Sequence, residues 1–440
     1  MNKPLVAIVG RPNVGKSTLF NRIVGRRLAI VEDVSGITRD RLCAESDWNG
    51  REFVLIDTGG LLLNNQDALV AEVTTQAQVA LEEADVVILM VDALAGIHPL
   101  DKDIVDYLRG SDKPILMAAN KADNEARATD SAEFYELGLG EVFPISALNG
   151  RTVADLLDAV VAAMPTEPAE ETYPEDAVRI AIIGRPNVGK SSLVNAILGE
   201  KRVIVSDIPG TTRDAIDTVF TRGDSTVVLI DTAGIRRSGK IQGSIEYYTV
   251  LRALRSMERA DVAMVVIDAD EGLRDGDKRV AGFAHDAGRA LVIVVNKWDL
   301  ASEEKDMREF ADNVRKQIPF ADYAPVVFTS AKTGMGVLAA VDTATDVASN
   351  HAMRISTGEL NRLLQDAVDN HPYARKGKEL RIRYVTMPTV KPPTIVVFVN
   401  NTDLVHFSYA RYLENTIRKT FAYEGTPIRL SFRQAKKERK

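Results

Sequence analysis

The sequence GRPNVGKS occurs twice in the chain, at residues 10–17 and again at 184–191. Both copies fit the pattern GxxxxGK[ST], a loop whose glycines let successive backbone N–H groups point inward at phosphate oxygens. In this pattern the lysine bridges the β- and γ-phosphates of a nucleotide and the following hydroxyl ligates Mg²⁺. The alternative is a glycine-containing turn before a structural helix. A strand-like run before both copies and a helix-like run after them favour phosphate binding.

The base is indicated by a second repeated motif, NKAD at 120–123 and NKWD at 296–299. Guanine presents its N1–H and its 2-amino group as adjacent donors, and one carboxylate accepts both in a charge-assisted contact. Adenine lacks this donor pair and would leave the carboxylate of Asp123 or Asp299 unpaired. The asparagines are expected to tie the base loop to the phosphate loop, and the lysines to lie over the base. The repeated motif therefore predicts guanine nucleotides.

Two further motifs, DTGG at 57–60 and DTAG at 231–234, follow apolar runs. Their aspartates are expected to hold Mg²⁺ through water, and their last glycines to let a backbone N–H approach the γ-phosphate. The threonines of SGITRD and PGTTRD, Thr38 and Thr212, are expected to be further Mg²⁺ ligands. Loops held only by the γ-phosphate and its metal loosen on hydrolysis, which predicts a switch. A backbone N–H in SAL and SAK, near Ser146 and Ser330, is expected at guanine O6.

These motifs define two sets of candidate site residues, one in each half of the chain. In the first set the expected nucleotide contacts are Gly10, Arg11, Pro12, Asn13, Val14, Gly15, Lys16, Ser17, Asp57, Thr58, Gly59, Gly60, Leu61, Asn120, Lys121, Asp123, Ser146 and Ala147. In the second set they are Gly184, Arg185, Pro186, Asn187, Val188, Gly189, Lys190, Ser191, Asp231, Thr232, Ala233, Gly234, Ile235, Asn296, Lys297, Asp299, Ser330 and Ala331. The expected catalytic residues are Lys16, Thr38, Gly60, Lys190, Thr212 and Gly234. The expected Mg²⁺ ligands are Ser17, Thr38, Asp57, Ser191, Thr212 and Asp231.

Strand-like and helix-like stretches alternate around the motifs of the first half. In residues 1–164 the candidate strands are VAIVG, FVLIDTGG, DVVILMVDA, PILMAANK and VFPIS, with helical periodicity between them, as in VTTQAQVALEEA. Short β-branched runs separated by helices predict an α/β fold with a doubly wound, mostly parallel sheet. A linker is expected at 165–177, because this segment is rich in proline and carboxylates and has little to bury.

Residues 178–349 repeat the order of the first block, with RIAIIG, TVVLIDTAG, DVAMVVIDA, ALVIVVNK and PVVFTS as strands. Corresponding motif residues are separated by 174, 174, 176 and 184 positions along the chain. The nearly constant separation indicates a domain duplication with a modest insertion late in the second copy. A solenoid is excluded, because its period is only about 20–50 residues.

Residues 350–440 have a different character. A helix, two strands, a second helix and a last strand predict a small α+β domain that ends in the frayed basic segment RQAKKERK. The block is basic, with 17 Lys and Arg against 8 Asp and Glu, although the whole chain has a net charge of −7. Tyr384, Phe398, Phe407 and Tyr412 lie among these charges and could stack RNA bases while the cations contact phosphates. Alternatively the aromatics belong to the core and the basic face docks on the acidic domains.

Composition excludes several classes of protein. Hydrophobic residues make up 45% and charged residues 27%, as in an ordinary globular protein. We expect a cytoplasmic protein without a membrane segment, since no long apolar run or signal-peptide pattern is present. The single cysteine, Cys43, excludes an intramolecular disulfide, and the five histidines have no metal-binding spacing.

Two complete sets of five motifs, an acidic linker and a small basic C-terminal domain resemble the Der (EngA) family of the TrmE-Era-EngA-like GTPases. The resemblance covers essentially the whole chain. It implies two P-loop GTPase domains followed by a KH-like domain, and hydrolysis of GTP to GDP. It also implies a monomer that acts in assembly of the large (50S) ribosomal subunit, with that subunit and its rRNA as partners.

The position after each DxxG motif departs from Ras-type GTPases, in which a glutamine there orients the attacking water. Leu61 and Ile235 occupy this position and cannot form a hydrogen bond through their side chains. Related GTPases with this substitution use a monovalent cation, commonly K⁺, held partly by the asparagine of the phosphate loop. The resemblance assigns that role to Asn13 and Asn187. In the alternative interpretation these asparagines only shape the loop.

Two other functions remain as alternatives to an assembly switch. An RNA-modification GTPase would feed a chemical step, but the sequence has no flavin motif or metal cluster to support one. A scaffold would have one GTPase domain that binds nucleotide without hydrolysing it, and intact motifs do not exclude unequal rates. KH domains usually bind RNA through a GXXG loop, and residues 350–440 contain no such loop.

Overall fold

The computed structural model describes residues 3–28, 43–58, 81, 84–165, 173–174, 176–200, 203–205, 217–232, 245–301, 306–375 and 377–435. The chain divides into two compact units. One unit contains residues 1–170 and 241–255, and the other contains residues 171–240 and 256–440. Within the described part of the chain, no helix is long and apolar enough to span a membrane.

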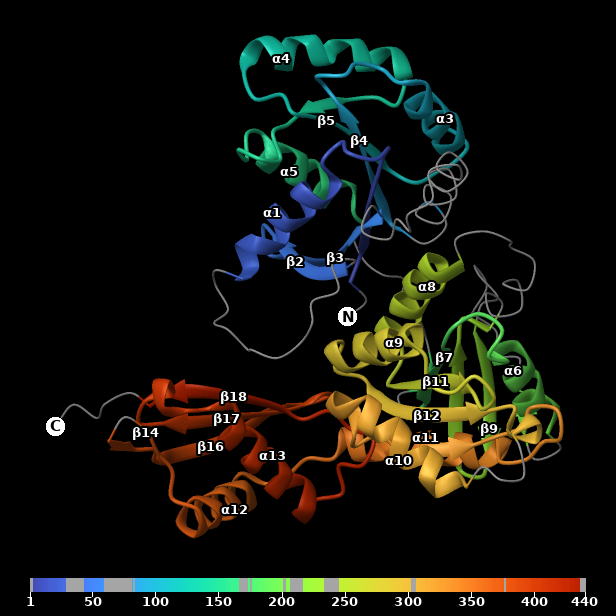
Figure 1. Cartoon of the computed structure of the whole chain (residues 1–440), viewed down its shortest axis with the longest axis vertical. Coiled ribbons are helices and arrows are strands. Elements are labelled where there is room, and N and C mark those ends of the chain that lie inside the picture. The colour runs from blue at the N-terminus through green and yellow to red at the C-terminus, as the bar shows by residue number, and fades with distance from the viewer. Residues whose placement is uncertain are drawn as a thin grey trace. The chain divides into compact units, whose positions relative to one another are not determined.

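The first unit contains a six-stranded sheet in the order β2-β3-β1-β4-β5-β6 (Figure 1). Its strands are β1 (Leu5–Val9), β2 (Cys43–Trp48), β3 (Arg51–Asp57), β4 (Val86–Asp92), β5 (Ile115–Asn120) and β6 (Val142–Pro144). All neighbouring strands are parallel except β2, which pairs antiparallel with β3 at the edge. The five predicted strands are confirmed. β2 was not predicted, because the polar residue Ser46 occupies a buried position in it and weakens the alternation of apolar and polar residues along the strand.

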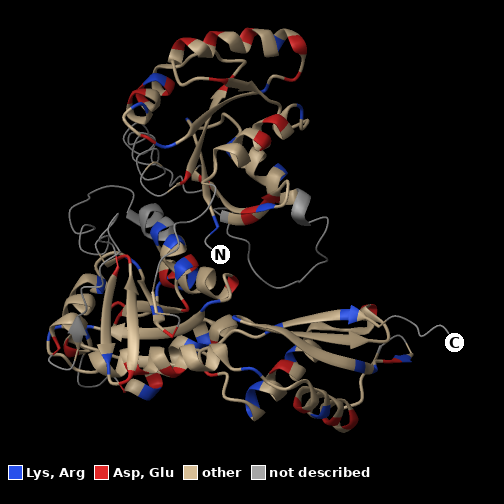
Figure 2. Ribbon diagram, turned by 180° about the vertical axis from the view of Figure 1, so that it is seen from behind, with Lys and Arg blue, Asp and Glu red and all other residues tan. Residues whose placement is uncertain are grey.

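Helices cover both faces of this sheet, as a doubly wound fold requires. They are α1 (Lys16–Leu28), α3 (Pro99–Leu108), α4 (Glu125–Asp130), η3 (Ser131–Leu137) and α5 (Val153–Ala163). Alternate residues of β1 enter two cores: Val6 and Ile8 pack with α1 and α5, whereas Ala7 and Val9 pack with α3 and η3. The central strands carry little charge (Figure 2), because they are buried on both faces. The predicted helical stretch VTTQAQVALEEA lies largely outside the described residues.

The second unit contains a seven-stranded sheet in the order β13-β12-β11-β7-β10-β9-β8. Its strands are β7 (Val178–Ile183), β8 (Ile204–Val205), β9 (Thr218–Arg222), β10 (Ser225–Ile230), β11 (Val262–Asp268), β12 (Ala290–Asn296) and β13 (Val326–Phe328). The strands β8, β9 and β10 pair antiparallel, and the others are parallel. The five predicted strands are again confirmed, but the edge strand β8 and its neighbour β9 were not predicted.

The helices around this sheet are α6 (Lys190–Gly199), α9 (Asp275–Asp286), η5 (Trp298–Leu300), α10 (Met307–Gln317), η6 (Pro319–Ala321) and α11 (Val337–Ala352). The helix α8 (Ile245–Arg259) begins among residues of the first unit and ends among residues of the second. The stretch between β12 and β13 holds η5, α10 and η6. Its counterpart between β5 and β6 holds α4 and η3 and is shorter. The late insertion predicted for the second copy therefore lies in this helical connection.

The C-terminal part of the second unit contains a three-stranded sheet in the order β16-β17-β18, with helices packed against it (Figure 1). Its elements are α12 (Thr357–Asn370), β14 (Ala374–Arg375), β15 (Lys378–Glu379), β16 (Ile382–Val390), β17 (Pro393–Val399), η7 (Thr402–Leu404), α13 (Phe407–Thr420) and β18 (Arg429–Gln434). Leu364, Val397 and Leu413 contribute to a separate hydrophobic core. The predicted helix-strand-strand-helix-strand order is confirmed, with β14 and β15 forming an additional small hairpin.

This small α+β part docks on the second doubly wound part through its backbone and its basic side chains. Leu291 N donates to Gly425 O at 2.7 Å, and Gly425 N donates to Tyr323 O at 2.9 Å. Lys391 Nζ lies 3.1 Å from Asp261 Oδ1. Of the two alternatives left open by the sequence, intramolecular docking of basic residues is therefore present.

The four aromatic residues singled out in this part have different environments. The side chains of Tyr384 and Phe407 are exposed. Tyr412 is half-buried, and its hydroxyl donates to Ala367 O at 3.0 Å. Phe398 is half-buried beside Tyr384, with 5.7 Å between the ring centroids. Packing within the domain therefore accounts for Phe398 and Tyr412. Stacking of RNA bases on the exposed Tyr384 and Phe407 stays a prediction.

Candidate nucleotide-binding sites

The backbone of the first phosphate loop has no room for side chains at its glycines. Gly10 has a φ of 146°, and a Cβ there would lie 2.3 Å from Met90 O. Gly15 has a φ of 102°, and a Cβ there would lie 2.2 Å from Asn120 Nδ2. The corresponding pairs in the second loop are Gly184 with Val266 and Gly189 with Asn296. Both loops therefore have the tight conformation that turns backbone N–H groups inward.

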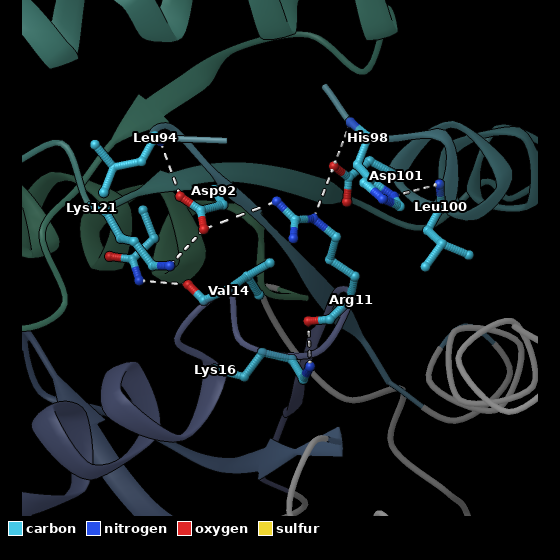
Figure 3. Close-up of polar contacts among 10 residues, drawn as sticks. Arg11, Val14, Lys16, Asp92, Leu94, His98, Leu100, Asp101 and Lys121 are labelled. Carbon is cyan, nitrogen blue, oxygen red and sulfur yellow. Dashed lines mark hydrogen bonds and ion pairs between the residues drawn. The ribbon is translucent and has the colours of Figure 1, made fainter. Parts of the chain in front are cut away.

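The lysine of each phosphate loop folds back over the loop. Lys16 Nζ donates to Gly10 O at 2.7 Å. It also donates to Arg11 O at 2.9 Å (Figure 3). The side chain is buried, and burial lowers the pKa of Lys16 to about 8, although the nearby charge of Asp57 raises it. Lys190 Nζ makes the same two contacts in the second loop. An anion at the loop would stabilise the protonated lysine that these carbonyls orient.

The asparagine of each base motif links three loops. Asn120 Nδ2 donates to Val14 O at 2.7 Å, and its Oδ1 accepts from Ala147 N at 2.8 Å. The expected link between base loop and phosphate loop is thus present in the structure. The contact expected between an SAL backbone N–H and guanine stays a prediction, because the Ala147 N–H is bonded to Asn120. In the second copy Asn296 bonds Val188 O and Ala331 N.

The two carboxylates that are predicted to read the base, Asp123 and Asp299, are held by neighbouring side chains. Asp123 Oδ1 accepts from Ser146 Oγ at 2.7 Å, and its Oδ2 accepts from Arg127 Nη1 at 2.9 Å. In the second copy Asp299 Oδ1 accepts from Ser330 Oγ at 2.6 Å. The serine of SAL or SAK therefore orients the carboxylate that would accept the two guanine donors.

The lysine of each base motif is paired with an aspartate that was not predicted from the sequence. Lys121 Nζ lies 2.5 Å from Asp92 Oδ2, and Lys297 Nζ lies 2.7 Å from Asp268 Oδ2. Burial alone would raise the pKa of Asp268, but hydrogen bonding from Lys297 and nearby backbone N–H groups lowers it overall. A sequence signal existed: VDA and IDA end equivalent strands in the two halves.

The described candidates for Mg²⁺ ligands are hydroxyl and carboxylate oxygens near the phosphate loops. Asp57 is fully buried at the end of β3. The next residue, Thr58, is held in place because its Oγ1 donates to Ile8 O at 2.8 Å. Ser17 lies in the first turn of α1, next to Lys16. In the second copy Asp231 follows β10 with a φ of 57°. Hard oxygen donors of this kind suit Mg²⁺.

The predicted switch residues lie outside the described part of the chain. They are Thr38, Gly59, Gly60, Leu61, Thr212, Ala233, Gly234 and Ile235. Their contributions to Mg²⁺ binding and hydrolysis stay predictions.

Comparison with known proteins identifies both halves and the C-terminal part. A family model described as "50S ribosome-binding GTPase" matches residues 5–121 and 179–297, and one described as "KH-domain-like of EngA bacterial GTPase enzymes, C-terminal" matches residues 354–433. The chain is 53% identical to GTPase Der of Pelotomaculum thermopropionicum over 442 residues, covering 100% of both chains. It is 52% identical to GTPase Der of Listeria monocytogenes, covering 99% of this chain and 100% of that one.

The chain belongs to the Der family of GTPases. It is a GTP hydrolase that binds guanine nucleotides, with two P-loop GTPase domains and a C-terminal KH-like domain. The fold class, the two GTPase domains and the KH-like domain predicted from the sequence are thereby confirmed. The domain limits at 164, 177 and 349 stay predictions.

Solved structures add only weak likenesses to this Der-family chain. Aquifex aeolicus Era bound to GDP·AlF₄⁻ is 24% identical, with a TM-score of 0.31, covering 59% of this chain and 88% of that one. The G domain of the FeoB iron transporter of T. maritima is 26% identical, with a TM-score of 0.28, covering 39% of this chain and 98% of that one. At such low TM-scores neither likeness supports a conclusion about function.

Proposed function

We propose that this Der-family GTPase is a GTP-driven switch in the assembly of the 50S ribosomal subunit, working in the cytoplasm as a monomer. The observation that supports this most is the match of both GTPase domains to a family described as 50S ribosome-binding. The basic KH-like domain is consistent with an rRNA partner, because clustered Lys and Arg attract phosphates.

In this proposal each GTPase domain binds one GTP or GDP. The backbone of residues 10–17 would surround the β- and γ-phosphates, and Lys16 would exchange its carbonyl contacts for phosphate oxygens. Asp123 would accept the two guanine donors. Mg²⁺ would be held by Ser17 and Asp57, with Thr38 added when GTP is bound. The second domain would use the corresponding residues Lys190, Asp299, Ser191, Asp231 and Thr212.

Hydrolysis in this proposal is slow and depends on a monovalent cation. Leu61 and Ile235 cannot orient the attacking water through a side-chain hydrogen bond. A K⁺ ion near the β- and γ-phosphates would supply positive charge where negative charge develops, held partly by Asn13 and Asn187. Such a slow enzyme is suited to timing a step of assembly.

Co-sedimentation with ribosomal subunits tests the proposed function. The full chain is centrifuged with 50S, 30S or 70S particles in the presence of GTP, GDP or a nonhydrolysable GTP analogue. We expect pelleting with 50S particles in one nucleotide state and little pelleting with 30S particles. Association that is absent, or equal with all nucleotides, contradicts the switch.

A scaffold with one silent GTPase domain is the second candidate, favoured by differences between the two phosphate loops described below. Lys16→Ala and Lys190→Ala variants, assayed one at a time, separate the two possibilities. If both sites turn over, each variant retains part of the GTPase activity. If one domain is silent, one variant loses all activity and the other loses none.

A further inference from the structure

The arginine of each phosphate loop is anchored to a fully buried aspartate. Arg11 Nε lies 3.4 Å from Asp101 Oδ2 (Figure 3), and Arg185 Nε lies 2.9 Å from Asp277 Oδ1. Both aspartates are 0% exposed. They lie in the first turns of α3 and α9, the helices that follow the strands β4 and β11. The phosphate loop is therefore tied to a neighbouring helix in each domain.

The buried aspartates are held rigidly by the helix ends. Asp101 Oδ2 also accepts from His98 N at 3.1 Å, and Asp277 Oδ2 accepts from Arg274 N at 3.0 Å. Burial raises the pKa of both carboxyls, although the partner arginine opposes this shift. The two domains share this anchor, so it cannot by itself make their sites different.

The second partner of the arginine differs between the domains. Arg185 Nη2 donates to Glu271 Oε2 at 2.9 Å, which completes a two-point attachment. Arg11 Nη2 lies 4.0 Å from Asp92 Oδ2, an oxygen already bonded to Lys121. Arg11 Nη2 is a buried atom without a hydrogen-bond partner among the described residues. Arg11 is thus hydrogen-bonded to one carboxylate and has only a longer ion pair with Asp92, whereas Arg185 is hydrogen-bonded to two carboxylates.

A single side chain accounts for this difference. The segments DALAG at 92–96 and DADEG at 268–272 align residue by residue, so Ala95 corresponds to Glu271. The glycines that follow, Gly96 and Gly272, both have a φ of 68°, so the two turns have the same conformation there. Ala95 is exposed, which leaves room for a longer side chain.

We propose that Glu271 is a positioning residue that holds Arg185 and stiffens the second phosphate loop, so that this site releases guanine nucleotide more slowly than the first. Arg185 also provides the carbonyl that accepts from Lys190 Nζ at 2.6 Å, so fixing the arginine fixes an atom that orients the lysine. A loop already in its binding conformation loses less freedom when nucleotide binds. The inference rests on the proposed placement of the phosphates at these loops.

A reciprocal exchange tests the inference in the full chain. The probe is GDP with a fluorescent N-methylanthraniloyl label, and its release is followed after addition of excess unlabelled GDP. Asp123→Asn restricts the probe to the second site, and Asp299→Asn restricts it to the first, since an amide cannot accept both guanine donors. In these backgrounds Glu271→Ala, Glu271→Gln and Ala95→Glu are compared with the parent.

Glu271→Ala should speed release at the second site by about two- to fivefold, the range of a partly exposed ion pair. Ala95→Glu should slow release at the first site by a similar factor, and Glu271→Gln should lie between Glu271→Ala and the parent. A high concentration of NaCl should shrink these differences in release rate, since it screens exposed charges, whereas a difference caused only by altered packing would persist.

Two controls and two contrary outcomes define the test. Glu271→Ala should leave release at the first site and the thermal midpoint of the chain unchanged. Unchanged release at the second site in both Glu271 variants, or equal acceleration at both sites, overturns the inference. Failure of the labelled GDP to bind either site overturns instead the proposed nucleotide placement, and with it this inference.

Discussion

At the scale of single residues, Lys16 makes the first site sensitive to pH. Its free-state pKa is about 8 because it is buried, and phosphate oxygens would raise that value by stabilising the charged form. Binding above pH 8 therefore takes up a proton, and the affinity for GDP should fall by up to about tenfold per pH unit. Affinity measured from pH 7 to 9.5 in the Asp299→Asn background checks this.

The same shift has the opposite effect on the stability of the nucleotide-free protein. The folded pKa of Lys16, about 8, lies below the ordinary value of 10.5, so the unfolded chain binds more protons between these values. The contribution of Lys16 to the free energy of unfolding should rise with pH across this window. Lys16→Arg, which stays charged, is the control and should flatten the pH dependence of affinity. If the affinity for GDP depended on pH equally in the parent and in Lys16→Arg, the predicted role of Lys16 would be contradicted.

The predicted residues and the missed ones differ in how they appear in the sequence. Asn120 and Asp123 belong to a motif with fixed spacing, and their hydrogen-bonding chemistry could be derived from the guanine base. Asp92 and Asp101 belong to no such motif, because their partners Lys121 and Arg11 are distant in the chain and meet them only when parallel strands align. The repeat of these aspartates in the second half was the available signal.

At the scale of elements, the phosphate loop offers a test of the K⁺ hypothesis. Asn13 and Asn187 have φ values of 66° and 65°, a left-handed conformation that favours glycine or asparagine, and both side chains are exposed. We expect GTPase activity to rise when K⁺ replaces Na⁺ at fixed ionic strength, because the side-chain oxygens help to hold the cation.

Glycine at these two positions separates the two interpretations of the asparagines. Asn13→Gly and Asn187→Gly keep the left-handed backbone and remove only the side chain. Loss of K⁺ stimulation in the glycine variants supports a cation ligand, and unchanged stimulation supports a role in loop shape alone. Equal rates of the parent in K⁺ and Na⁺ would remove the hypothesis.

Element types were easier to predict in the middle of each sheet than at its edges. Central strands such as β4 and β11 are apolar on both faces, so their sequences are continuous hydrophobic runs. The antiparallel strands β2, β8 and β9, which lie at or next to a sheet edge, are short or mixed in polarity, and antiparallel strands need only one apolar face. Their pairing depends on the neighbouring strand, which sequence patterning does not reveal.

At the scale of the whole molecule, composition indicated a basic C-terminal domain but could not choose its partner. Basic side chains are complementary both to RNA and to the acidic GTPase domains, so net charge favours neither. In the second unit, the docking of the KH-like domain on the GTPase domain depends on hydrogen bonds between their backbones. Gly425 accepts from Leu291 at the start of β12 and donates to Tyr323, and these contacts cannot be inferred from charge.

The docking of the KH-like domain within the second unit should depend on Gly425. Its φ is 71°, and a Cβ there would lie 2.4 Å from Val347 Cγ2 on α11. Gly425→Ala should therefore break the two backbone hydrogen bonds and speed hydrogen exchange at the Leu291 amide. Gly377→Ala is the matched control, since Gly377 has the same φ of 71° but nothing within 4 Å of its Cβ position.

The two substitutions separate steric overlap from backbone strain. Both carry the strain of a left-handed alanine, about 1–2 kcal/mol, but only Gly425→Ala meets another side chain. Adding Val347→Ala removes the two methyl groups that the new Cβ would overlap, so the double variant should recover much of the protection at Leu291. Fast hydrogen exchange at the Leu291 amide in Gly377→Ala, or no recovery of its protection in the double variant, would contradict the prediction. Either result would mean that the close fit of Gly425 against α11 does not hold the domain in place.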